Sequence, residues 1–165
     1  MDVTTMQALT KAGGYCAMAL GAFGSGLGAG IAASAAIGAW KKCYAQERPA
    51  PFQLAVFAGA PLTQTIYGMI MMFIINGKAE SAYANWPLFL IIGLVGGTAM
   101  GVSAWLQGQA AAGACDAFGE TSKGFTNNLM AIGIVETVAI FVLAFSLVLI
   151  TQIACAAPQE SMARP

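Results

Sequence analysis

One stretch decides the fold of this chain: Ile132-Gly-Ile-Val-Glu-Thr-Val-Ala-Ile-Phe-Val-Leu-Ala-Phe-Ser146. It is the centre of an apolar segment of membrane-spanning length, and Glu136 is the only charged residue between positions 124 and 159. A charge at the middle of a bilayer costs from about 2.5 to more than 10 kcal/mol, so such residues are rare and usually functional. We therefore expect Glu136 to have polar neighbours that stabilise it and a role that requires it.

The composition excludes a water-soluble domain. Of the 165 residues, 58% are hydrophobic and 8% are charged, whereas soluble domains carry about 25% charged residues. The formal net charge is zero, which argues against nucleic acid as a partner. The chain has no histidine, and its four cysteines are far apart. The sequence therefore predicts neither histidine-based catalysis nor a zinc site or disulfide framework, and we expect no cofactor.

Three uncharged apolar runs, and a fourth in which Glu136 is the lone charge, predict four transmembrane helices. They lie near residues 12–45, 51–76, 86–117 and 124–154. Each run exceeds the ~20 residues that a helix needs to cross the hydrocarbon core of a bilayer. Because backbone groups in lipid need internal hydrogen-bond partners, the predicted fold class is an all-α membrane protein.

The charges between these helices predict the orientation of the chain. The basic residues of linkers 41–51 and 116–124 are Lys41, Lys42, Arg48 and Lys123, and those on the other side are Lys11, Lys78 and Arg164. By the positive-inside rule, the two linkers lie in the cytoplasm and both termini lie outside. We therefore expect a multi-pass protein of the cell (inner) membrane.

Small residues dominate the first and third predicted helices, and the pattern repeats. The glycine-rich run 26–38 aligns with 101–113, and Gln64 in the second helix aligns with Glu136 in the fourth. Glycines at spacings of two and four let helix backbones approach closely. We therefore expect the first and third helices to pack tightly, either inside a single bundle or as the inner wall of a larger assembly.

The repeat divides the chain into two tandem hairpins of the same orientation. The first covers residues 12–77 and the second 86–154, followed by a polar C-terminal tail, 155–165. The carboxylate site is kept in the second hairpin, where Glu136 lies. In the first hairpin it is replaced by Gln64.

Residues equidistant from a hairpin turn lie at equal depth. Gln107 and Glu136 are each about fourteen positions from a turn near Thr121, which is ~21 Å at 1.5 Å per residue. The repeat assigns Gln64 to the same level. This arrangement predicts two amides beside the carboxylate in the middle of the membrane.

The neighbours of Gln64 add further oxygen atoms. Thr63 and Tyr67 share a helix face with it, and Pro61 can free the carbonyl of Ala60 by disturbing the helix. Amide, hydroxyl and carbonyl oxygens can coordinate a small hard cation that the carboxylate neutralises, while a tyrosine hydroxyl can orient the carboxylate. A site with oxygen ligands alone favours Na⁺ or H⁺ over a transition metal.

The alternative interpretation is that these polar groups only hydrogen-bond the helices together. A carboxylate with two glutamines at one level argues against it. For Thr98, Ser103, Thr137 and Ser146 we do expect the simpler role, as packing or back-bonding hydroxyls.

A family resemblance rests on the duplicated small-residue helices and on three stretches: Pro61-Leu-Thr-Gln-Thr-Ile-Tyr-Gly68, Leu106-Gln-Gly-Gln-Ala-Ala-Ala-Gly113 and Ile134-Val-Glu-Thr-Val-Ala-Ile140. They resemble the membrane rotor (proteolipid, c or K) subunit of bacterial V/A-type rotary ATPases. The resemblance implies a ring of four-helix copies in the V0 sector, with a glutamate on the outer helices as the ion carrier.

The resemblance also implies which residues bind the ion. In sodium-translocating members the binding groups match Thr63, Gln64, Gln107, Glu136 and the backbone carbonyl of Ala60, while a tyrosine matching Tyr67 holds the carboxylate. Ala60 stands where the sodium pattern has leucine, which matters little for a backbone ligand. Proton-translocating relatives commonly lack the full set of amides and hydroxyl, so Na⁺ is favoured and H⁺ is the alternative.

The resemblance further implies a subunit that is not an enzyme on its own. Its expected partners are copies of itself, a stator membrane subunit with an essential arginine, central-stalk subunits at linkers 41–51 and 116–124, and lipid. The competing hypothesis is a stand-alone small cation transporter or channel that uses Glu136 as its coupling site. Such transporters often contain inverted repeats, whereas these hairpins repeat in parallel. A membrane enzyme is disfavoured because no nucleophile–base pair is present.

Overall fold

The computed structural model describes the backbone of residues 1–156 and the side chains of residues 1–152. The described part is helical: α1 (Val3–Ala45), α2 (Gln53–Gly59), the 3₁₀ turn η1 (Ala60–Leu62), α3 (Thr63–Lys78), the 3₁₀ turn η2 (Tyr83–Asn85), α4 (Trp86–Thr121) and α5 (Phe125–Ala156). Because η1 joins α2 to α3, these elements form four rods, each long and apolar enough to cross a membrane. The predicted fold class is confirmed. The predicted tail, 155–165, lies outside the described residues except at its first two positions.

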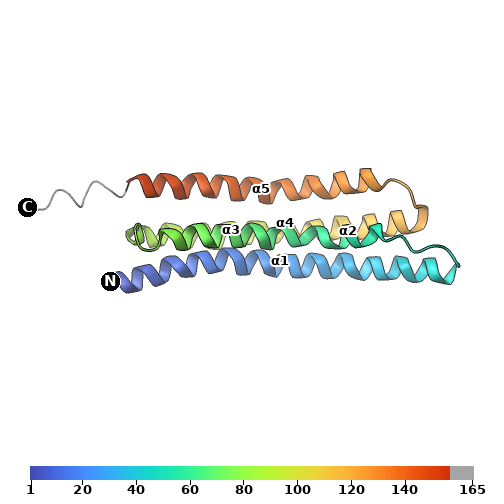
Figure 1. The fold of residues 1–165 in the computed structure, drawn as a ribbon, viewed down its shortest axis with the longest axis horizontal. Helices are drawn as coiled ribbons and strands as arrows, with labels where there is room; N and C mark the ends of the chain where they lie inside the picture. Colours follow the sequence, from blue (N-terminus) through green and yellow to red (C-terminus); the bar gives the residue numbers. More distant parts are fainter. Residues whose placement is uncertain (157–165) are drawn as a thin grey trace, which may run out of the picture.

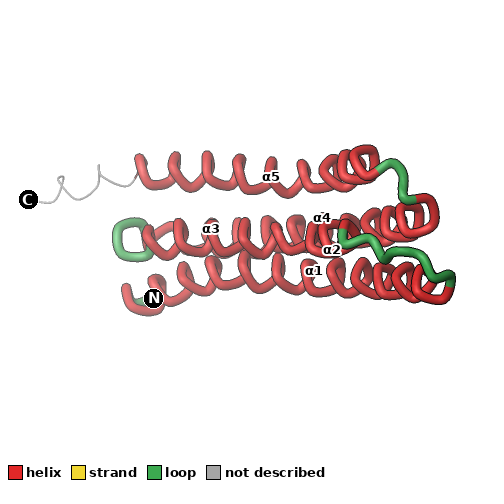
Figure 2. The backbone as a smooth tube through the Cα atoms, turned by 45° about the vertical axis from the view of Figure 1, so that its right-hand side comes forward, coloured by secondary structure: helices red, strands yellow, loops and turns green. Residues whose placement is uncertain are grey.

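The four rods run alternately up and down (Figures 1 and 2). α1 and α4 run in one direction, while α2–α3 and α5 run in the other (Figure 1). The connections 46–52 and 122–124 therefore lie at one end of the bundle. The N-terminus, the turn around η2 and the end of α5 lie at the other end (Figure 1).

Two helices are longer than their apolar runs because polar residues extend their ends. α1 begins at Val3, not near residue 12, since the carboxylate of Asp2 accepts the N–H of Thr5 and caps the helix. α4 continues to Thr121, where Ser122 adopts a left-handed conformation and donates its N–H to the carbonyl of Phe118. Such a residue ends a helix by satisfying one of its last carbonyl groups.

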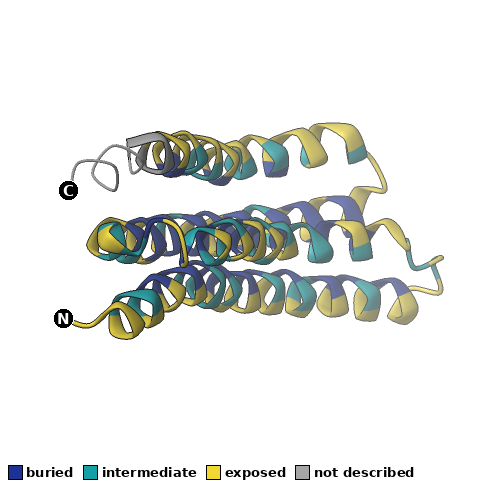
Figure 3. Ribbon diagram, turned by 60° about the vertical axis from the view of Figure 1, so that its left-hand side comes forward, coloured by how far each residue is buried: buried dark blue, intermediate teal, exposed yellow. Residues whose placement is uncertain are grey.

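The core of the bundle is the contact between α1 and α4, which is the most extensive contact between elements. A side chain at Gly24 would overlap the backbone of Gly101, and one at Gly28 would overlap that of Ala104. The two backbones thus approach more closely than side chains allow, as the small-residue pattern predicts. Buried residues follow this contact along the bundle, and exposed ones cover its outer sides (Figure 3).

α5 is the least buried of the four rods. Near the 122–124 turn its Phe125 stacks on Phe57 and meets the edge of Phe118, with ring centroids 5.3 and 5.9 Å apart. Toward its other end, α4 and α5 leave an apolar groove of about 530 Å³ between them. α5 is therefore fixed by aromatic packing at one end and contacts the bundle more loosely elsewhere.

Candidate ion-binding site

The site begins at the break between α2 and α3. Pro61 has no N–H to donate, and the chain tightens there into the 3₁₀ turn η1. The carbonyl of Ala60 consequently accepts from the backbone N–H of Thr63. The Thr63 hydroxyl oxygen lies 3.2 Å from this carbonyl and also 3.2 Å from Gln64 Oε1. Three oxygen atoms therefore meet within one turn of the chain.

Two buried glutamines connect this turn to α4 and α5. Gln64 Nε2 donates to Gln107 Oε1 at 2.7 Å, and both side chains are 0% exposed. Gln107 Nε2 lies 3.3 Å from both Glu136 Oε2 and the carbonyl of Ile132. A buried amide left without partners is costly, so these bonds fix both glutamines in place.

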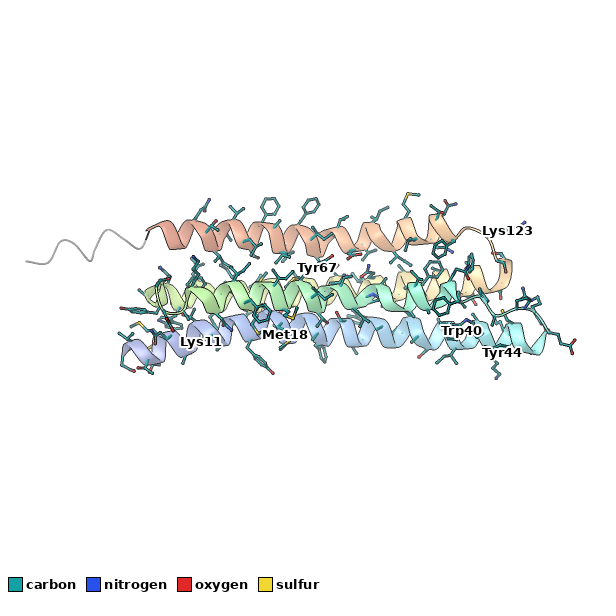
Figure 4. The ribbon with its side chains drawn as sticks, viewed as in Figure 1. Lys11, Met18, Trp40, Tyr44, Tyr67 and Lys123 are labelled. Carbon is teal, nitrogen blue, oxygen red and sulfur yellow. The ribbon has the colours of Figure 1, made fainter. Side chains whose placement is uncertain are left out.

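Glu136 is half-buried and accepts a second hydrogen bond on its other oxygen. The Tyr67 hydroxyl donates to Glu136 Oε1 at 2.7 Å, and the tyrosine points from α3 toward α5 (Figure 4). Within residues 1–152 the ion pairs all involve Lys42, at the end of α1. In this part of the chain Glu136 therefore has neutral hydrogen-bond donors and no cationic partner.

The structure brings all six residues predicted for the site together. They are Ala60, Thr63, Gln64, Tyr67, Gln107 and Glu136, linked by hydrogen bonds across three helices. Their oxygen atoms carry one formal negative charge. Such a set can replace the hydration shell of a small hard cation while the carboxylate neutralises its charge. Their role as ion ligands stays a prediction.

One of the four hydroxyls assigned a packing or back-bonding role bonds between helices and not within its own. Ser103 does not bond to its own helix: its hydroxyl donates across to the carbonyl of Val135 on α5, at 3.0 Å. Thr98 and Thr137 do back-bond as expected, to Leu94 and Ile134. Ser103 lies four residues before Gln107 and therefore shares its helix face, but the sequence alone does not say which bond its hydroxyl makes.

The part of the chain that carries Ser103, Gln107 and Glu136 is similar in sequence to a known protein family. Residues 90–149 match the family model of the ATP synthase C subunit. The matched range includes Gln107, Ser103 and Glu136 but not the first hairpin. No curated protein matches the chain. The match covers the second hairpin alone, and it makes this hairpin similar to the proteolipid subunit of ATP synthases. Together with the four spanning helices, it indicates an integral membrane protein.

Proposed function

We propose that this chain is the rotor-ring subunit of a V/A-type rotary ATPase and carries one Na⁺ at Glu136. Transport of the ion would be coupled to ATP hydrolysis or synthesis. The observation that carries the proposal is the hydrogen-bonded cluster around Glu136, a single carboxylate held between Tyr67 and Gln107 in the middle of four apolar helices.

Support for the V/A type comes from the internal repeat. The chain contains two hairpins, and the position of Glu136 is occupied in the first hairpin by Gln64. One carboxylate then serves four helices, as in the V/A-type rotor proteins that the sequence resembles.

Support for Na⁺ comes from the oxygen atoms around the carboxylate. A proton carrier needs only the carboxylate, whereas this cluster adds the Ala60 carbonyl, the Thr63 hydroxyl and two amide oxygens. Each of these oxygens has a second lone pair for a cation. These additional oxygen atoms can coordinate a cation, whereas a carried proton has little need of them.

The charge of the site determines the proposed mechanism. An empty Glu136 is a charge that lipid disfavours, and a loaded one is neutral and can pass the lipid-facing sector of the ring. A stator protein with an arginine would then favour release of the ion at the exit path. The membrane potential acts on each ion with about 2.3 kcal/mol per 100 mV. In ATP synthesis this energy would drive rotation of the ring. In ATP hydrolysis the rotation would supply this energy to the ion.

The proposed contact with the central stalk lies at the 46–52 and 122–124 end. Lys42 Nζ lies 3.2 Å from the carboxylate of Asp116 and 2.9 Å from that of Glu120. Arg48 donates to the carbonyls of Gly119 and Glu120. These bonds join the two hairpins at this end, so the stalk would meet one surface rather than two separate loops.

The first experiment that tests this function is carbodiimide labelling of the purified protein in mild detergent. A hydrophobic carbodiimide should label Glu136, and Na⁺ should slow the labelling at fixed pH because it occupies the site. Choline chloride at the same ionic strength is the control and should have no effect. Equal labelling rates with and without Na⁺ would favour H⁺ as the carried ion. Absence of labelling at Glu136 would refute its role as the carrier.

The second test is the substitution Glu136→Gln. It removes the charge but keeps the side-chain volume and one of the two acceptor oxygens, so the ring should assemble while ATP-driven transport is abolished. Glu80→Gln is the matched control, because Glu80 is exposed in the turn before η2, and it should transport normally. Transport by the Glu136→Gln protein in reconstituted vesicles would contradict the proposal.

A further inference from the structure

α5 is held to the rest of the bundle by few polar contacts. Within residues 1–152, the hydrogen bonds that it receives from other helices come from three side chains: Tyr67, Ser103 and Gln107. Tyr67 bonds only to the carboxylate of Glu136 and so follows that side chain. Ser103 and Gln107 also bond to the backbone of α5 and can therefore fix the helix itself.

Ser103 and Gln107 contact the backbone on the N-terminal side of Glu136. They lie one turn apart on the same face of α4. Ser103 donates to the carbonyl of Val135 at 3.0 Å, and Gln107 Nε2 lies 3.3 Å from that of Ile132. Two contacts three residues apart on α5 restrict both its rotation about its own axis and its shift along that axis. A single contact would leave the rotation much freer.

Apolar packing holds α5 at buried residues such as Ile132 and Ala139 but leaves open grooves beside the helix. Ser103 itself lines an apolar groove of about 340 Å³ between α4 and α5, together with Val102, Leu106 and Val138. A larger groove of about 530 Å³ continues along the same two helices. With this space beside it, α5 can turn by a small angle unless polar contacts hold it. Such a turn would carry Glu136 away from Tyr67 and Gln107.

We propose that Ser103 is a positioning residue for ion binding: its bond to the Val135 carbonyl holds α5 at the rotation that aims Glu136 at Tyr67 and Gln107. The proposal rests on the function proposed above, in which Glu136 carries the ion. It assigns to Ser103 no contact with the ion. The hydroxyl acts on the backbone of α5, and the backbone sets the direction of the carboxylate.

The test compares Ser103→Ala with the wild type by carbodiimide labelling of Glu136. In Ser103→Ala the Val135 carbonyl keeps its bond within the helix, so the protein should fold and assemble. Its carboxylate should turn from its donors toward the reagent and label faster without Na⁺. The Na⁺ concentration that halves the labelling rate should rise about three- to tenfold, the range that corresponds to one hydrogen bond.

Two further variants separate positioning from general packing. Ser103→Thr keeps the hydroxyl, and the groove beside it has room for the added methyl group, so both values should return toward wild type. Ser146→Ala removes a buried hydroxyl from α5 near Gly96 of α4, ten residues beyond Glu136, and should change neither value. Wild-type values in Ser103→Ala would overturn the proposal. So would an equal change in Ser146→Ala, or a failure of Ser103→Thr to restore the values.

The two readouts keep this proposal distinct from the function on which it rests. If Na⁺ fails to protect the wild type, the Na⁺ assignment is wrong, and the labelling rate without Na⁺ still decides the role of Ser103. A second outcome is that Na⁺ protects the wild type and Ser103→Ala equally and that both proteins are labelled at the same rate without Na⁺. In that case the positioning role is wrong and the Na⁺ assignment stands.

Discussion

At the scale of the residue, the notable property of Glu136 is that its partners are neutral. Tyr67 and Gln107 each donate one hydrogen bond to it. A cationic partner in this position would form a permanent ion pair and would compete with any transported cation. Neutral donors orient the carboxylate and leave its charge available, which is the condition for binding and releasing an ion repeatedly.

The first residue-scale prediction concerns the Tyr67 hydroxyl. Tyr67→Phe removes the 2.7 Å bond to Glu136 Oε1 and keeps the ring. Because hydrogen bonds to charged groups contribute about 1.5–3 kcal/mol, the Na⁺ concentration that halves carbodiimide labelling should rise roughly ten- to hundredfold. Tyr83→Phe is the control, since Tyr83 lies in η2 at the end of the bundle, and it should match the wild type. Unchanged protection in Tyr67→Phe would contradict the orienting role.

Most of the geometry at this scale could be predicted from the sequence. The equal depth of Gln107 and Glu136 follows from helix rise and the position of the turn, which are insensitive to packing detail. The bond from Ser103 could not be predicted, because a helical serine can equally bond to its own backbone. Which bond forms depends on the distance between α4 and α5, a property of the packed bundle and not of the local sequence.

At the scale of the element, α1 and α4 depend on glycine at their contact. A Cβ atom at Gly24 would overlap the backbone of Gly101, whereas one at Gly26 would meet nothing within 4 Å. The same glycine-rich run thus presents one face to α4 and another away from it. Sequence spacing predicts close packing of this run but does not say which glycines make the contact.

The element-scale prediction uses these two glycines as a matched pair. Gly24→Ala should force α1 and α4 apart and destabilise the protein by about 1–3 kcal/mol, as overpacking does. Gly26→Ala should leave stability unchanged or raise it by up to about 1 kcal/mol, because alanine favours helix. Thermal unfolding in detergent, followed by circular dichroism, measures both. Equal midpoints for the two variants would show that the α1–α4 contact does not require glycine at position 24.

The ends of elements were less predictable than their centres. Apolar runs located all four rods, because membrane thickness sets a minimum length for them. They did not locate the start of α1, which depends on the Asp2 cap. Nor did they reveal that the second rod consists of α2, η1 and α3. Pro61 indicated a disturbance, but the extent of the 3₁₀ turn depends on how Ala60 and Thr63 satisfy their backbone groups.

At the scale of the whole molecule, the surface of the isolated chain is largely apolar. Large exposed side chains occur on each of the rods, among them Phe23, Phe73, Val95 and Phe145. A contiguous apolar surface of this kind marks contact with a membrane or with other proteins. Lipid can cover such side chains, but it provides no position from which a half-buried Glu136 could alternate between two access paths. In the proposed function, a ring of copies supplies this alternation by rotating past a second protein.

The last prediction tests that ring directly. The chain has a mass of 16.9 kDa, and native mass spectrometry in mild detergent should give one species at a large, fixed multiple of this value. Glu136→Gln should give the same multiple, because the proposed role of the carboxylate lies in ion binding and not in assembly. A stand-alone transporter would instead appear as a monomer or dimer. That outcome would leave the ion site intact but would remove rotation as its mechanism, because two access paths would then have to open alternately within a single copy or pair.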